Sequence, residues 1–202
     1  MIIGIDEAGR GALAGPVVAG AACFVVPLSV KNCSVLSLIT DSKKLTDTQR
    51  REVESWLKEN IIYGVGVVSA AQIDELGIKP ANELAMNQAL GKVLDQLTSE
   101  QKKDLQLQID GRDKFKFPLP SEDIVKGDEK VLEISAASIM AKVTRDDYMI
   151  ALAKTEPQFG FETHKGYGAT SHYKLLDEGI YCAEHRKSYD PLKTWLNQGR
   201  LF

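Results

Sequence analysis

Two adjacent acids at the end of a strand-like segment constrain this sequence more than any other feature. The run Ile-Ile-Gly-Ile at residues 2–5 predicts a buried strand, and Asp6 and Glu7 follow it directly. Residues 8–15 then contain three glycines, which allow the chain to turn sharply. Successive side chains of a regular strand point to opposite faces, so both carboxylates serve one site only if the backbone turns there. We therefore expect a site at this strand end whose negative charge must be compensated.

Apolar periodicity predicts alternating strands and helices along the chain. Strands are expected at residues 1–6, 17–26, 61–69 and 105–110, with a short one around residues 124 and 125. Thr46 and Gln49 form a capping-box pattern, and helices are expected from there to about 59 and at 80–97, 133–154 and 171–178. Residues 160–168 are expected to form a loop. The pattern predicts an α/β core over residues 1–140 and a mostly helical C-terminal part over residues 141–202.

Composition excludes several classes of protein. The 202 residues are 44% hydrophobic and 26% charged, which is typical of a globular chain with a sizeable core. The longest apolar stretch near the start is too short to span a bilayer, and no basic leader precedes it, so we expect a cytoplasmic protein without membrane contact. The three cysteines form no C-x-x-C pair and are expected to be reduced.

The glycines at 9, 11 and 15 superficially resemble a dinucleotide-binding fingerprint. Their spacing is one residue too long for that motif, and Pro16 would interrupt the helix that should follow. Two carboxylates directly before the loop would also repel a pyrophosphate group. A nicotinamide site is therefore disfavoured.

Two further acids lie where they could join the first pair. Asp110 is the last residue of the predicted strand at 105–110, and Asp146 lies on the long helix, with Lys142 one turn before it. Oxygen ligands of this kind suit Mg²⁺ or Mn²⁺, whereas zinc sites favour Cys and His. Two such ions activate water and stabilise the leaving oxygen of a phosphoryl displacement. The spacing alone leaves Asp113 and Asp147 as alternatives to Asp110 and Asp146.

Eight ordered blocks make the chain similar to a known family. They are DEAGRG (6–11), LAGPV (13–17), DSKKL (41–45), IDG (109–111), KGD (126–128), ISAASIMAKVTRD (134–146), HKGYG (164–168) and HRKSY (185–189). With these blocks the chain resembles ribonuclease HII, the bacterial type 2 ribonuclease H, nearly from end to end. One departure is Ala12, where the family usually has proline, a change that removes no reactive group.

The resemblance implies a ribonuclease H-like fold, a mixed β-sheet flanked by helices, with a helical C-terminal extension that completes the active site and contacts the substrate. It implies that Asp6, Glu7, Asp110 and Asp146 are the catalytic acids and hold two Mg²⁺ or Mn²⁺ ions. It therefore favours Asp110 over Asp113 and Asp146 over Asp147.

The resemblance also implies how substrate is recognised. The Gly9-Arg10-Gly11 turn would read the ribose 2′-hydroxyl, and Tyr167 would pack on a sugar at an RNA-to-DNA junction. Ser42 and Lys43 would hold backbone phosphates. Because the net charge is −3, any basic footprint for nucleic acid must be a local patch.

The implied activity is metal-dependent hydrolysis of the RNA strand of RNA/DNA hybrids. It includes incision on the 5′ side of ribonucleotides embedded in duplex DNA, which leaves 5′-phosphate and 3′-hydroxyl ends. We expect a monomer, and the sequence does not say whether a replication clamp recruits it. The alternatives are a hybrid-binding module without activity, which loss of an acid would favour, and a related nuclease that acts on pure DNA.

Overall fold

The computed structural model describes residues 1–25, 33–39 and 45–198 of the chain. Ser42 and Lys43, the expected phosphate contacts, lie outside the described residues. Within the described part, no helix combines the length and the apolar character needed to cross a membrane.

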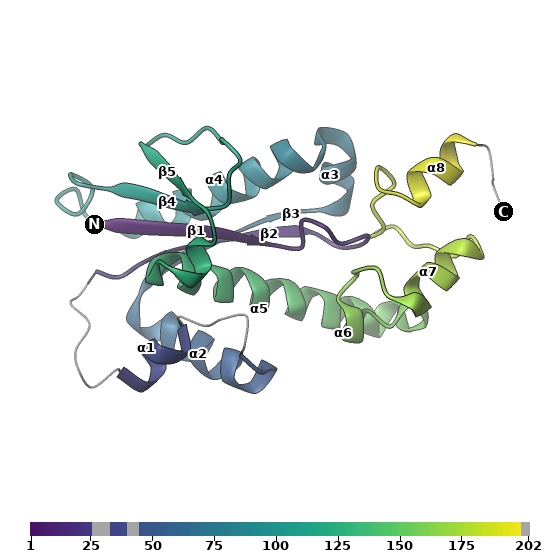
Figure 1. Ribbon diagram of the computed structural model, residues 1–202, viewed down its shortest axis with the longest axis horizontal. Coiled ribbons are helices and arrows are strands. Elements are labelled where there is room, and N and C mark those ends of the chain that lie inside the picture. The colour runs from purple at the N-terminus through teal and green to yellow at the C-terminus, as the bar shows by residue number, and fades with distance from the viewer. Residues whose placement is uncertain (26–32, 40–44, 199–202) are drawn as a thin grey trace.

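A five-stranded mixed sheet forms the centre of the molecule, with the strand order β3-β2-β1-β4-β5 (Figure 1). Its strands are β1 (Ile2–Ala8), β2 (Val17–Cys23), β3 (Ile62–Val68), β4 (Gln106–Asp110) and β5 (Ser121–Ile124). The pairs β1–β2 and β2–β3 are antiparallel, whereas β1–β4 and β4–β5 are parallel. The parallel pairing brings the C-terminal ends of β1 and β4 to the same edge of the sheet, with Ile5 opposite Ile109.

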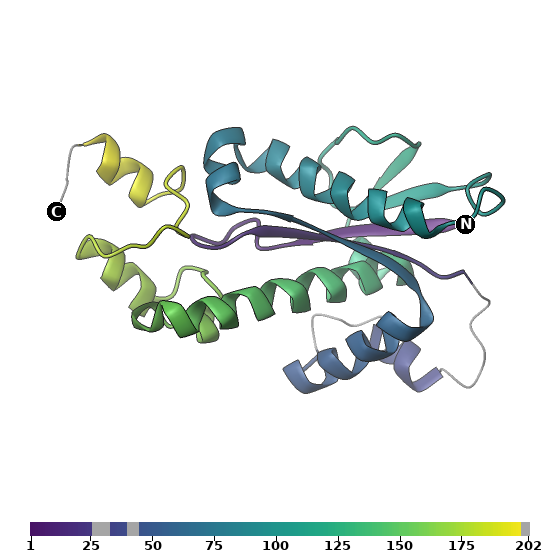
Figure 2. The same ribbon diagram turned by 180° about the vertical axis from the view of Figure 1, so that it is seen from behind.

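Helices cover both faces of the sheet (Figure 1). One face carries α3 (Ala70–Leu76) and α4 (Ile78–Gln96), and the other carries α5 (Leu132–Thr155) with α1 (Cys33–Ile39) and α2 (Asp47–Asn60) beyond it. The view from behind shows α6 (Phe161–His164), α7 (Thr170–Asp177) and α8 (Leu192–Asn197) gathered at one end of the molecule (Figure 2).

Small residues let α5 lie directly on the sheet. A Cβ placed on Gly4 or Gly20 would come within 2.2 Å of the α5 backbone, at Glu133 and Ala137 respectively. That approach explains why the start of α5 is rich in Ala and Ser. It also brings the polar side chains of α5 within reach of the acids at the end of β1.

Most expected elements are confirmed, with their ends shifted by a few residues. The Thr46 capping box forms as predicted, and Asp110 is the last residue of β4. The expected loop at 160–168 is wrong in part because Phe161–His164 is a short helix, and α1, α3 and α8 were not predicted. These helices are six or seven residues long, or four in α6, so apolar periodicity has little length over which to act.

The expected domain boundary near residue 140 falls inside α5, which is one continuous helix. Its start packs on β1 and β2 at Glu133 and Ala137, and near its end Met149 and Ala153 pack with Phe159 and Phe161 of the C-terminal part. Described residues after 140 are helices and turns, and an isolated bridge between Ala14 and His185 ties them back to the N-terminal segment.

Candidate active site

Asp6 lies two residues before the end of β1 and is 6% exposed. Its Oδ1 accepts a hydrogen bond of 2.7 Å from the Glu7 backbone N–H, and the hydroxyl of Ser138 on α5 also hydrogen-bonds the carboxylate. Burial raises the pKa of Asp6 well above its usual value, and the negative charges of Glu7 and Asp110 raise it further. The ionised carboxylate is therefore held in a place where the protein itself compensates it poorly.

Glu7 follows on the same strand but lies next to a different helix. Burial is the main cause that raises its pKa, and the negative charges of Asp110 and Asp113 add to this. The amide of Asn82 on α4 and the guanidinium of Arg10 offset part of the increase. Asn82 itself is fully buried. Both acids of the pair thus interact with Asp110 although their immediate neighbours come from helices on opposite faces of the sheet.

Asp110 and Asp113, the two alternatives for the acid after β4, have different partners in the structure. Asp110 Oδ1 accepts a 2.6 Å hydrogen bond from the backbone N–H of Gly127, which fixes the carboxylate at the end of β4. Asp113 instead pairs with Arg10 at 2.5 Å and with Lys79 at 3.4 Å. These cations, Arg10 first, lower the pKa of Asp113. Asp113 is therefore already compensated by cations, whereas Asp110 repels Asp6 and Glu7.

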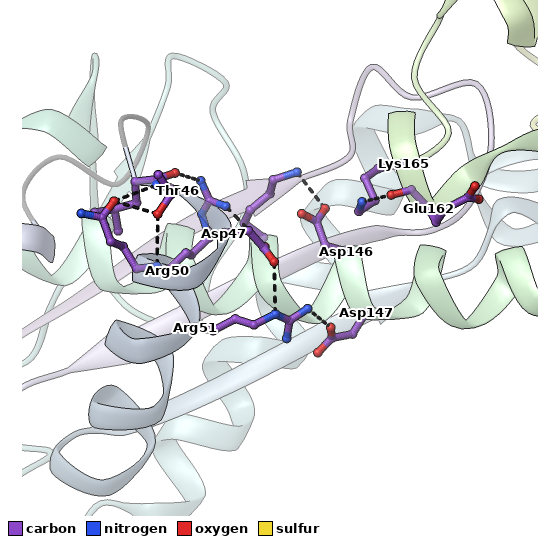
Figure 3. Close-up of polar contacts among 11 residues, drawn as sticks. Thr46, Asp47, Arg50, Arg51, Asp146, Asp147, Glu162 and Lys165 are labelled. Carbon is purple, nitrogen blue, oxygen red and sulfur yellow. Dashed lines mark hydrogen bonds and ion pairs between the residues drawn. The ribbon is translucent and has the colours of Figure 1, made fainter.

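Asp146 and Asp147 also differ in their surroundings (Figure 3). Asp146 is 6% exposed, and its Oδ1 accepts a 2.7 Å bond from Lys142 Nζ one turn earlier on α5. Asp147 is exposed and pairs with Arg51 of α2 at 2.5 Å. Among the described residues, the interactions of Asp146 are with Lys142 and Arg145, and none joins it to the other three acids.

A hard divalent cation fits the chemistry of this donor set, which is entirely carboxylate oxygen. Asp6, Asp110 and Asp146 each have Oδ1 held by a protein donor, so their orientation is defined before any ion binds. Within the described ranges, no three His, Cys, Asp or Glu side chains are grouped closely enough to hold one ion together. The fit therefore rests on the donor chemistry and on the mutual repulsion of Asp6, which is buried, with the partly buried Glu7 and Asp110.

A cavity of about 400 Å³ opens beside Glu7. Its lining includes Glu7, the Gly9-Arg10-Gly11 turn and Tyr167, together with Arg50, Ser138 and Lys142. The structure thus brings the expected ribose-reading turn and the expected sugar-packing tyrosine to the same opening as one of the acids. Tyr167 is 38% exposed, and the Arg145 guanidinium lies 5.1 Å from the centre of its ring.

Sequence reasoning missed several residues of this site. Arg50 lines the cavity from α2, while Arg145 and Arg186 lie fully buried behind the glycine turn. Arg145 and Arg186 belong to the blocks at 134–146 and 185–189, so the blocks were the available signal. An arginine in a sequence is nevertheless expected at the surface, because charged side chains are rarely buried without a partner.

Comparison with known proteins identifies the family. The family model described as Ribonuclease HII matches residues 3–190. The ribonuclease HII of Staphylococcus aureus (strain bovine RF122 / ET3-1) is 42% identical over 197 residues, which are 97% of this chain and 72% of that protein. The ribonuclease HII of Chlorobaculum parvum is 43% identical over 191 residues, covering 93% of this chain and 88% of that protein. The chain belongs to the ribonuclease HII family.

As a member of the ribonuclease HII family, the protein is an endoribonuclease that cleaves the RNA of RNA/DNA hybrids, and divalent-metal dependence is a property of the family. The crystal structure of ribonuclease H2 from Pyrococcus horikoshii OT3 has a TM-score of 0.72 at 26% identity and covers 100% of this chain and 99% of that one. A ribonuclease HIII in complex with Mn²⁺, at 18% identity, has a TM-score of 0.68 over 98% of this chain and 70% of that one, which shows the shared fold. The predicted ribonuclease H-like fold is therefore confirmed.

Proposed function

We propose that Asp6, Glu7, Asp110 and Asp146 hold two Mg²⁺ or Mn²⁺ ions and that the chain uses them to hydrolyse a phosphodiester bond on the 5′ side of a ribonucleotide. The observation that carries this proposal is the mutual repulsion of Asp6, Glu7 and Asp110, of which Glu7 lines the cavity. Buried carboxylates of like charge are costly unless a cation compensates them. When bound, the two ions would activate water and stabilise the leaving oxygen, giving 5′-phosphate and 3′-hydroxyl ends.

The protein's own part is to orient the acids. The Ser138 hydroxyl and the Glu7 N–H hold Asp6, and the Gly127 N–H holds Asp110. Lys142 lines the cavity and bonds Asp146, which supplies a positive charge where a substrate phosphate would lie. These contacts keep the carboxylates in place, so binding of the ions needs little rearrangement of the backbone.

Recognition of ribose is assigned to the Gly9-Arg10-Gly11 turn and to Tyr167. Nothing lies within 4 Å of a Cβ placed on Gly11, so the backbone there is open to a sugar. Tyr167 presents an exposed ring across the same cavity. In this proposal residues 1–140 supply Asp6, Glu7, Asp110 and the turn, while residues 141–202 complete the site with Asp146 and Tyr167. Ser42 and Lys43 remain predicted phosphate contacts.

The test uses one DNA duplex that carries a single embedded ribonucleotide, incubated with Mg²⁺ or Mn²⁺ and without either. The expected result is a metal-dependent nick on the 5′ side of that ribonucleotide, and the all-DNA duplex of the same sequence stays intact. Equal cleavage of both duplexes would instead favour a nuclease acting on DNA. Binding without any cleavage in either metal would favour a hybrid-binding module.

We also propose that the protein acts as a cytoplasmic monomer. The ribonuclease HII of Archaeoglobus fulgidus, 25% identical with a TM-score of 0.64 over 100% of this chain and 91% of that one, was solved in complex with PCNA. Contact with a sliding clamp is therefore a candidate interaction for this chain. Co-elution with the clamp of the same cell in gel filtration, and the mass of the free protein, test these two points.

A further inference from the structure

A buried arginine from the C-terminal segment holds the glycine turn from behind. Arg186 is fully buried, and it donates to three backbone carbonyls: Gly9 at 2.7 Å, Arg10 at 2.9 Å and Gly15 at 3.0 Å. The Tyr189 hydroxyl donates a second hydrogen bond of 2.8 Å to the Arg10 carbonyl. Hydrogen bonds from a charged donor are shorter and stronger than those between neutral groups. The turn is therefore fixed by two side chains more than 170 residues away in the sequence.

The direction of these carbonyls determines where the amides of the turn point. In a trans peptide the C=O and the N–H lie on opposite sides, and both peptides of this turn are trans. The Gly9 carbonyl shares its peptide with the Arg10 N–H, and the Arg10 carbonyl shares its peptide with the Gly11 N–H. Because both carbonyls face Arg186 in the interior, both N–H groups face away from it. Neither N–H donates to any protein acceptor within the described residues.

These two N–H groups belong to residues that line the cavity. A cation bonded to the carbonyl side of a peptide polarises the group and makes its N–H a better donor. Burial, more than the neighbouring charge of Arg145, lowers the pKa of Arg186 to about 10, which still leaves the guanidinium charged at neutral pH. The turn is thus a pair of outward donors with a permanent positive charge behind them.

We propose that Arg186 is a positioning residue for ribose recognition: it orients and polarises the Arg10 and Gly11 amides so that they bind the ribose 2′-hydroxyl and its adjoining phosphate. Tyr189 assists through its bond to the same Arg10 carbonyl. This inference rests on the proposed function of the turn. It assigns the specificity of the site to a side chain that never touches the substrate.

The experiment measures ribose recognition separately from general duplex binding. kcat/KM is measured on a duplex with one embedded ribonucleotide in Mg²⁺, and the all-DNA duplex of the same sequence serves as a competitive inhibitor whose KI is measured in the same assay. For Arg186→Lys we expect kcat/KM to fall by about 10- to 100-fold because a single ammonium cannot reach three carbonyls. The KI of the all-DNA duplex should stay within about twofold, since that duplex has no 2′-hydroxyl to lose.

Two further variants make the result decisive. Tyr189→Phe keeps the ring and removes only the hydroxyl, so we expect the same selective loss of kcat/KM at about three- to tenfold. It also serves if Arg186→Lys does not fold. Leu57→Ala creates a cavity in the buried cluster between α2 and α5, which contains no residue of the turn, and it should lower the melting temperature while keeping both constants.

The proposal would be overturned if kcat/KM and KI changed in parallel in Arg186→Lys and in Tyr189→Phe, as expected when a variant only loses folded protein. Retention of the full preference for ribose in both variants would also overturn it. Failure of the proposed function looks different, because the unsubstituted protein itself would then cleave the two duplexes equally or leave both intact.

Discussion

The site has an acidic half, formed by Asp6, Glu7, Asp110 and Asp146, and a basic half, formed by the buried Arg145 and Arg186. The charges of the two halves are compensated in different ways. Burial and the negative charges around them raise the pKa values of Asp6 and Glu7, and hydrogen bonds from the protein offset only part of this increase. Arg186, by contrast, donates from all three nitrogen atoms of its guanidinium to the carbonyls of Gly9, Arg10 and Gly15. The acidic half therefore needs a cation from outside the chain, whereas the basic half is completed by the chain itself.

Arg145 and the histidines extend the basic half. Arg145 donates to the Pro16 and Ala14 carbonyls, although its second terminal nitrogen has no partner within the described residues. His185 and His172 share a 2.9 Å bond between their Nε2 atoms, and His172 Nδ1 lies 2.8 Å from the Tyr167 carbonyl. In the proposed function, one half binds the ions and the other holds the loops that contact the substrate.

The largest expected effect is the loss of cleavage on Asp6→Asn. We expect the turnover rate to fall by about a thousandfold or more, since metal-ion stabilisation of the transition state is worth several kcal/mol. At the same time the metal-free protein should become more stable by about 1 kcal/mol, or about 2–4 °C in melting temperature, because a repelled buried charge is removed. Single-turnover cleavage and thermal unfolding in EDTA measure the two effects.

Asp113→Asn is the matched control for that prediction. Asp113 is compensated by Arg10 and Lys79, so its loss should leave turnover within about tenfold and should not stabilise the protein. If Asp6→Asn keeps its activity, or if it destabilises the metal-free protein as much as a core substitution does, the acidic half does not differ from the basic half in the way described.

The second prediction concerns how the free energy of unfolding changes with pH, which has opposite signs for His185 and for Asp6. Burial, and then the charge of His172, lower the pKa of His185 to about 4. The unfolded chain therefore binds an extra proton between about pH 4 and 6.5, and this contribution to stability is lost as the pH falls through that range. The shift corresponds to about 3 kcal/mol at 1.36 kcal/mol per pKa unit. Asp6 acts in the other direction, because its raised pKa makes the carboxylate reduce stability as the pH rises.

Urea denaturation of Asp6→Asn across pH 4 to 7 removes the opposing contribution of Asp6. Glu7, whose pKa burial also raises, still opposes the histidine, so the histidine contribution is the difference between this variant and the same variant without His185. We expect the free energy of unfolding to rise steeply up to about pH 6.5 and then to level off. His185→Phe in the same background should remove most of that slope. A slope that stays the same without His185 would show that other groups determine the pH dependence.

The third prediction is stabilisation of the acidic half by divalent ions. A ligand present at 100 times its Kd stabilises a protein by about 2.7 kcal/mol per site, which is about 5–10 °C for a chain of this length. Mg²⁺ or Mn²⁺ should therefore raise the melting temperature of the unsubstituted protein and of Asp113→Asn. In Asp6→Asn most of that increase should disappear, and an equal increase in all three proteins would place the ions elsewhere.

The acidic half was far easier to predict from the sequence than the basic half. Asp6 and Asp110 stand at the ends of strongly patterned strands, and parallel pairing of those strands brings the two ends together. Such a position follows from local periodicity and one pairing rule. The choice between Asp146 and Asp147 came from the family resemblance, and the two have different partners in the structure.

The basic half depends on contacts between distant parts of the chain. Arg186 bonds carbonyls 171 to 177 residues earlier, and no local pattern encodes that distance. The packing of His164, His172 and His185 around Phe159 and Phe161 is a second set of contacts that no local pattern predicts. Short helices such as α6 and α8 were not predicted for a related reason, because tertiary packing determines where they form.

The smallest expected effect tests whether a surface cation behaves like the buried ones. Arg51 pairs with Asp147 at 2.5 Å and with Asp47 at 3.4 Å, and its side chain is 38% exposed. Exposed pairs contribute about 0.2–1 kcal/mol because water and salt screen them. We therefore expect Arg51→Met and Asp147→Asn each to lower the free energy of unfolding by less than about 1 kcal/mol, with cleavage unchanged. Urea denaturation of both variants and of the double variant measures the pair, and high salt should shrink the effect. Arg51 pairs with Asp147 and not with Asp146. A loss of cleavage in Asp147→Asn would therefore mean that Asp147, rather than Asp146, belongs to the acidic half.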